Sequence, residues 1–158
     1  MNDTPRLLVV DDEPDNFEVV EILLFREGYD LVFARDGEAA LREMERQLPD
    51  TILLDAMMPE WNGFEVCRYI RSRPEWQHVP ILMVTALDSK RDLARGIDAG
   101  ANDFISKPMN AVELRARVRS LLRVKQQYDQ LRTLLKTRED LSNALVHDFR
   151  NPLSSIMI

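Results

Sequence analysis

The chain has 158 residues, of which 45% are hydrophobic and 30% charged, with one cysteine and a formal net charge of −6. This length suits one compact domain with additional residues, and a single cysteine excludes a disulfide-stabilised scaffold. No apolar run approaches the roughly 18 residues of a membrane helix, and the N-terminus lacks the apolar region of a signal peptide. We therefore expect an acidic, soluble, cytoplasmic protein without a membrane segment.

Composition and charge change near Pro108. Residues 1–108 carry 12 Lys and Arg against 22 Asp and Glu, a net charge of −10, whereas residues 109–158 carry 9 against 5, a net charge of +4. All five glycines lie at or before Gly100, and neither Gly nor Pro occurs between Pro108 and Pro152. The chain is therefore expected to consist of two different parts.

The first part alternates between strand and helix patterns. Short apolar runs bounded by Pro, Gly, Asp or Asn predict strands at residues 7–10, 31–33, 52–54, 81–84 and 104–105. Apolar residues spaced three or four apart predict helices within residues 17–24, 39–44, 64–70 and 93–99. This alternation predicts an α/β fold with a doubly wound parallel sheet. Ligands of such sheets bind beyond the carboxyl ends of the strands.

Polar residues stand at four of the five predicted strand ends, namely Asp11, Asp12, Asp55, Thr85 and Lys107. Four of them have an ordinary structural explanation: a helix cap at Asp12, a turn at Asp55, a half-buried strand threonine at Thr85 and a solvated lysine at Lys107. Together these explanations fail, because clustered carboxylates repel one another unless a cation lies between them. Hard oxygen ligands at this density suit Mg²⁺.

Four segments resemble, in order and spacing, the receiver (response-regulator) domain of two-component signalling. They are LLVVDDEPDN at residues 7–16, LLDAMMPEWNGFE at 53–65, MVTA at 83–86 and ISKP at 105–108. The resemblance covers about residues 5–124. It implies a flavodoxin-like sheet of five parallel strands in the order 2-1-3-4-5.

The resemblance also implies roles for the acidic residues. Asp55 would be the phosphoacceptor, which is chemically reasonable because a carboxylate can act as a phosphoryl nucleophile. Asp12 and Asp55 would ligate Mg²⁺ directly, Asp11 would act through water, and the Met57 carbonyl would be a further ligand. The phosphodonor would be a phosphohistidine protein or a small phosphodonor.

Three further residues would respond to the phosphoryl group. Lys107 would pair with it, followed by a cis peptide bond to Pro108, and Thr85 would donate a hydrogen bond to it. Phe104 occupies the place of the aromatic residue that, in this family, fills the space that the threonine vacates. Thr85 and Phe104 are therefore predicted to form the switch.

The second part is predicted to be one long helix. Val112, Leu114, Val118, Leu121 and Leu122 would face the sheet as the fifth helix of the receiver. Beyond it, a 4-3 spacing predicts a coiled-coil stalk in a parallel homodimer, through Val124, Tyr128, Leu131, Leu135, Arg138, Ser142, Leu145 and Phe149. Arg138 and Ser142 interrupt this seam, where Leu134 and Leu141 would take over. A helix folded back on its own receiver is the alternative. The nine basic residues of this part are dispersed among acidic ones and no base-reading motif follows, which argues against binding of nucleic acid.

His147 lies two residues from both Leu145 and Phe149, so on a helix it points away from that apolar stripe. The string HDFRNPL at residues 147–153 resembles the H-box of histidine kinases. The resemblance implies that His147 is phosphorylated and that Asp148 assists it. We therefore expect a receiver at residues 1–124, followed at 125–158 by a coiled-coil helix and a truncated phosphotransfer helix.

The predicted function is phosphorelay signalling at the front of a receiver-first histidine kinase. The receiver would catalyse its own phosphorylation, but this chain carries no ATP-binding domain. One alternative is a stand-alone response regulator whose C-terminal helix only dimerises, and another is a non-phosphorylated scaffold. An aspartate-nucleophile phosphatase is a third, although Met57 stands where such enzymes need a second acid.

Overall fold

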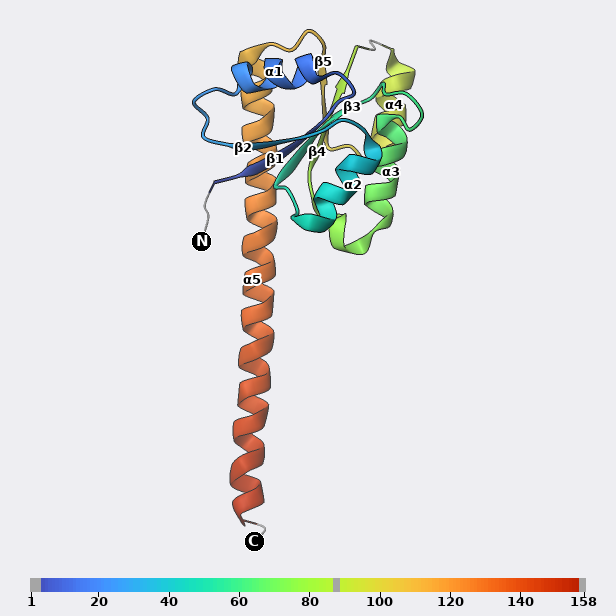
Figure 1. Ribbon diagram of the computed structural model, residues 1–158. Coiled ribbons are helices and arrows are strands. Elements are labelled where there is room, and N and C mark those ends of the chain that lie inside the picture. Colours follow the sequence, from blue (N-terminus) through green and yellow to red (C-terminus); the bar gives the residue numbers. More distant parts are fainter. Residues whose placement is uncertain (1–3, 87–88, 157–158) are drawn as a thin grey trace. The chain divides into compact units, whose positions relative to one another are not determined.

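The computed structural model describes residues 4–86 and 89–156, with side chains through residue 148. Five parallel strands form one sheet in the order β2-β1-β3-β4-β5 (Figure 1). The strands are β1 (Arg6–Val10), β2 (Asp30–Ala34), β3 (Thr51–Asp55), β4 (Ile81–Thr85) and β5 (Asp103–Ser106). The predicted flavodoxin-like sheet and its strand order are confirmed.

Helices follow the strands in alternation. They are α1 (Pro14–Leu23), α2 (Gly37–Arg46), α3 (Gly63–Ser72), α4 (Lys90–Ala99) and α5 (Ala111–Ile156), with a short 3₁₀ turn at Pro74–Trp76. Figure 1 shows α1 and the first turns of α5 on one face of the sheet, and α2, α3 and α4 on the other. Each face carries its own buried apolar cluster, as a sheet covered on both sides requires.

Local sequence explains where these helices begin. Pro14 occupies the first turn of α1, where its missing N–H costs nothing. The N-cap position of α1 is Glu13, whose side chain makes no capping hydrogen bond, so Asp12 does not serve as the cap. The other helices begin at residues whose side-chain oxygens accept from free backbone N–H groups, which are Asp36, Asn62, Ser89 and Asn110.

Of the five residues expected to face the sheet from α5, Leu114, Val118, Leu121 and Leu122 are buried, and Val112 is not. Val112 was expected to face the sheet but is 74% exposed, because it lies about 200° around α5 from the buried Leu114. Leu93 and Ile97 are also exposed, at 47% and 58%, whereas Gly96 and Ala99 form the buried side of α4. Small residues face inward there because the ring of Phe104 packs directly against Gly96.

Internal contacts divide the chain into two compact units, Met1–Lys125 and Gln126–Ile158, and α5 spans the boundary. In the second unit, every side chain that the structure describes is exposed. Its exposed apolar residues include Leu131, Leu134, Leu135, Leu141 and Leu145. Within the described residues, no helix combines the length and apolar character needed to cross a membrane.

Candidate functional site

Four strand ends bring the predicted polar residues to one edge of the sheet. Asp11 follows β1 directly, and Asp55 is the last residue of β3. Thr85 ends β4, and Lys107 follows β5. The carboxyl ends of parallel strands share one edge, which explains how residues from distant parts of the sequence meet.

Three carboxylates lie together at this edge. One oxygen atom from each of Asp11, Asp12 and Asp55 lies within 4.8 Å of the other two. Asp11 and Asp55 are buried, so little water screens their charges. Ionised carboxylates at this separation repel one another, and a divalent cation with oxygen ligands would relieve that repulsion. The residues present therefore fit Mg²⁺.

Lys107 bridges two of these carboxylates. Its Nζ atom lies 3.4 Å from Asp11 Oδ2 and 3.4 Å from Asp55 Oδ2. Burial opposes the charged ammonium, but the charges of Asp55 and Asp11 outweigh it and raise the pKa of Lys107. The lysine is therefore a fixed positive charge beside Asp55. The peptide bond from Lys107 to Pro108 is cis, as expected.

The environment of Asp55 disfavours its ionised form. Burial is the largest cause that raises the pKa of Asp55, and the charge of Asp11 adds to it. Lys107 and the Met57 N–H, which donates to Asp55 Oδ1 at 3.2 Å, act in the opposite direction. Additional positive charge at this edge would therefore favour the carboxylate that a nucleophile requires.

We expect Asp55→Asn to raise the free energy of unfolding at pH 7 when no divalent cation is present. Because folding raises the pKa of Asp55, the carboxyl contributes stability below its unfolded pKa and loses it as the pH rises through the folded pKa. The advantage of the variant should therefore disappear near pH 3, below the usual Asp pKa of about 3.9. Urea unfolding of the parent chain and of Asp55→Asn, in EDTA at pH 7 and at pH 3, measures this difference in the free energy of unfolding. Equal stability at pH 7 would contradict the expectation.

Met57 lies in the loop between β3 and α3. Its backbone N–H holds Asp55 Oδ1, and its side chain is 57% exposed. Its neighbour Met58 is buried in the core and anchors the loop. The loop backbone that was expected to supply a carbonyl ligand thus lies directly beside the acidic cluster.

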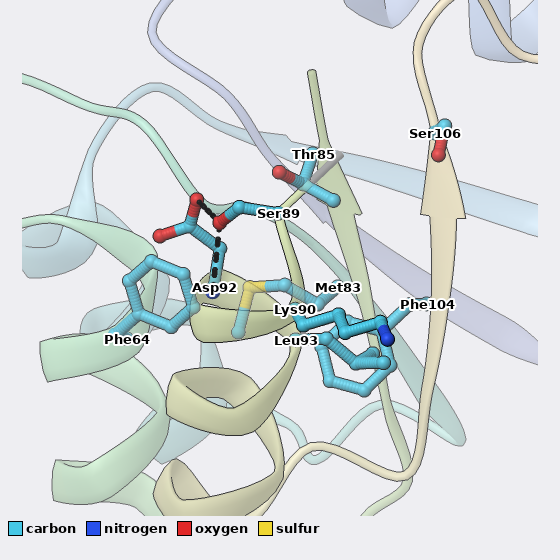
Figure 2. A pocket seen from close by; sticks show the side chains of 9 residues that line it. All are labelled: Phe64, Met83, Thr85, Ser89, Lys90, Asp92, Leu93, Phe104 and Ser106. Atoms are coloured by element: carbon cyan, nitrogen blue, oxygen red, sulfur yellow. Dashed lines mark hydrogen bonds between the residues drawn. The ribbon is translucent and has the colours of Figure 1, made fainter. Parts of the chain in front are cut away.

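Thr85 and Phe104 line one cavity. Phe104 pairs with Met83 across β4 and β5, so Thr85, two residues further along β4, points to the same face of the sheet. The cavity has a volume of about 220 Å³ and also touches Phe64, Ser89, Lys90, Asp92, Leu93 and Ser106. Figure 2 shows Thr85 and Phe104 in this lining. Space for movement therefore lies between the two residues predicted to form the switch.

The other two predicted site residues lie in the second unit. His147 and Asp148 are exposed residues of α5. The side chains of residues 149–153, which complete the H-box string, lie outside the described residues. The structure thus brings together the three carboxylates, Thr85 and Lys107 within the first unit, residues 1–125.

Two residues beside the site were not singled out in the sequence. The side-chain amide of Asn16 donates to both oxygens of Asp11. Gly63, at the start of α3, lies against the backbone of Asp55. The sequence signal for Asn16 was its position, as a polar residue in the first helical turn after the strand-end carboxylate Asp11. For Gly63, the signal was a glycine at the start of a helix.

Comparison with known proteins agrees with this geometry. A family model described as response regulator receiver domain matches residues 7–119. The chain is 47% identical over 127 residues to the response regulator PleD of Caulobacter vibrioides, covering 80% of this chain and 28% of that protein. It is also 42% identical over 118 residues to the Bacillus subtilis regulator PhoP, and this match covers 75% of this chain and 48% of that protein. The chain thus spans between about a quarter and a half of these relatives.

A solved structure is similar as well. The receiver domain of sensor histidine kinase PA1611 from Pseudomonas aeruginosa superposes with a TM-score of 0.68 at 35% identity, covering 78% of this chain and 98% of that one. That structure is described with a magnesium ion coordinated in its active site cleft.

Proposed function

This chain belongs to the response regulator receiver domain family, and from that premise we propose that Asp55 accepts a phosphoryl group in a Mg²⁺-dependent phosphorelay. The observation that carries the proposal is the grouping of Asp11, Asp12 and Asp55 within 4.8 Å, with Lys107 Nζ 3.4 Å from both Asp11 and Asp55. The donor is a phosphohistidine protein or a small phosphodonor.

Each residue has a defined part in the transfer. An Asp55 carboxylate oxygen attacks phosphorus, the bond from phosphorus to the donor breaks, and an acyl phosphate forms. Asp12, Asp55 and the Met57 carbonyl would hold Mg²⁺, with Asp11 acting through water, and the ion would supply charge neutralisation and alignment. Lys107 neutralises charge on the transferred group, and the Thr85 hydroxyl donates a hydrogen bond to it. Movement of Thr85 opens space for Phe104 to rearrange.

Intact mass after incubation with acetyl phosphate and Mg²⁺ tests this function. We expect one phosphoryl adduct on the parent chain and none on Asp55→Asn, which keeps the size of the side chain but lacks the nucleophilic carboxylate. Sustained release of phosphate without an adduct would favour the phosphatase alternative. The absence of both adduct and turnover in the parent would favour the non-phosphorylated scaffold.

For the second unit, the proposal is a coiled-coil homodimer in front of a histidine-kinase phosphotransfer helix. The receiver then comprises residues 1–124, and residues 125–158 form the coiled-coil and H-box segment. Exposed Leu131, Leu135 and Leu145 support pairing of this helix, because exposed apolar stripes on a long helix are typical of coiled coils. The exposed His147, with Asp148 beside it, supports phosphotransfer. The PA1611 receiver comes from a sensor histidine kinase, so a receiver and a histidine kinase occur together in that protein.

A dimer through this helix should be sensitive to charge on its apolar stripe. We expect Leu131→Glu to weaken the association of the chain by at least about tenfold, because it buries a carboxylate between two helices. Gln126→Glu adds the same charge on the opposite side of α5 and serves as the control. Sedimentation equilibrium measures the dissociation constant of each variant and of the parent chain. A parent chain that stays monomeric, or equal dissociation constants for the two variants, would contradict a dimer through this stripe.

A further inference from the structure

We propose that Asn16 is a positioning residue that orients Asp11 for Mg²⁺, an inference that rests on the proposed function above. Asn16 lies in the first turn of α1. Its Nδ2 atom lies 3.1 Å from Asp11 Oδ1 and 3.0 Å from Asp11 Oδ2. The same nitrogen is 3.3 Å from Glu13 Oε2. One neutral amide thus holds the buried carboxylate and the adjacent acidic side chain.

The contacts of Asp11 leave its carboxylate little freedom to rotate. Oδ1 accepts from the backbone N–H of Glu13 at 2.9 Å and from Asn16. Oδ2 accepts from Lys107 Nζ at 3.4 Å and from Asn16. The terminal torsion of an aspartate is soft, so hydrogen bonds rather than intrinsic rotamer preference set its plane. Among the contacts that the structure describes, the side chain of Asn16 is the one that reaches both oxygens.

If this amide is removed, Lys107 is the one side-chain donor to Asp11 Oδ2 that remains among the described residues. Asp11 would then be free to turn toward Lys107, which also contacts Asp55 at 3.4 Å. Closer pairing of Asp11 with Lys107 would turn away the Asp11 oxygens that should face the cation through water. This change would weaken cation binding, although it alters no residue expected to contact the metal directly.

The neutrality of Asn16 suits this task. When Asp11, Asp12 and Asp55 are all ionised, their three negative charges and the positive charge of Lys107 leave a net charge of −2, which matches a divalent cation. An amide stabilises the ionised Asp11 through hydrogen bonds without adding positive charge that would repel the metal. A lysine or arginine at the same place would hold Asp11 equally well but would compete with the cation.

Calorimetric titration of the full chain with Mg²⁺ tests the inference. We expect Asn16→Ala to raise the dissociation constant for Mg²⁺ by about 10- to 100-fold, the usual effect of losing a hydrogen bond that orients a ligand. Asn16→Leu should behave alike and also excludes a water that could replace the amide. Asp15→Asn alters the same turn of α1 and is the control, because no contact of Asp15 with Asp11 is among those that the structure describes.

Phosphorylation by acetyl phosphate provides a second readout that a purely structural role would not produce. The Mg²⁺ concentration that gives half the maximal rate should rise by the same factor as the dissociation constant, while the rate at saturating Mg²⁺ stays within about twofold. Melting temperatures in EDTA establish that the variants are folded. Unchanged Mg²⁺ affinity in both folded Asn16 variants would overturn the inference. A parent chain that binds no Mg²⁺ would instead overturn the proposed function.

Discussion

Replacing Gly63 with alanine is expected to destabilise the protein by on the order of 3 kcal/mol and to impair phosphorylation of Asp55. A Cβ atom at this position would overlap the carbonyl oxygen of Asp55 and would lie 2.8 Å from Cα of Ala56. Both atoms belong to the backbone, so no change of rotamer can relieve the overlap. The N–H of Gly63 also donates to the Ala56 carbonyl at 3.0 Å, which holds α3 against the end of β3.

Gly96→Ala is the matched comparison for this prediction. The nearest atoms to a Cβ atom at Gly96 all belong to the ring of Phe104, where it would overlap Cε1 and lie 2.6 Å from Cζ. That ring is half-buried and borders the cavity of Figure 2, so it can move, and alanine is the better helix former by about 1 kcal/mol. Urea unfolding of the two variants should therefore show the larger loss for Gly63→Ala. A loss below about 1 kcal/mol at Gly63 would contradict the assigned contact.

Replacing Lys107 with glutamine is expected to slow phosphorylation of Asp55 by about 10²- to 10³-fold at saturating Mg²⁺. Lys107 Nζ lies 3.4 Å from Asp55 Oδ2, where it can neutralise charge that develops on the transferred phosphoryl group. Lys107 also opposes the factors that raise the pKa of Asp55, so its loss makes the ionised nucleophile less favourable. Both effects reduce the rate in the same direction.

Lys90→Gln is the control for the lysine prediction. Lys90 is an exposed lysine at the start of α4 that lines the cavity near Thr85, and its replacement removes the same charge. Time courses of adduct formation by intact mass, with acetyl phosphate as donor, compare both variants with the parent. A rate for Lys107→Gln within about threefold of the parent would show that the lysine is not required for the transfer.

The sequence predicted the elements well because burial on both faces of a parallel sheet leaves a clear pattern. Apolar runs such as residues 52–54 correspond to strands whose residues are all buried, as in β3 and β4. The apolar spacing in residues 93–99 predicted the helix α4, but its inward side consists of Gly96 and Ala99, whereas Leu93 and Ile97 are exposed. Hydrophobic periodicity cannot identify a buried face that is made of small residues.

The candidate site was predicted in outline but not in its supporting contacts. Asp11, Asp55 and Thr85 stand at strand ends, so the parallel topology alone places them at one edge. Asn16 and Gly63 lie close to Asp11 and Asp55 only because the first turns of α1 and α3 pack against that edge. Such contacts depend on how a helix leaves its strand, which residue spacing does not encode.

By itself, the sequence determined the class of fold, the acidic character of the first part and the helical nature of the second. Composition and periodicity are enough for these properties, because each depends on residues near one another in the chain. Only the tertiary structure decided that Lys107 bridges Asp11 and Asp55, that Asn16 holds both oxygens of Asp11, and that Phe104 packs on Gly96. These are distances between side chains on different elements, and packing of the helices against the sheet sets them.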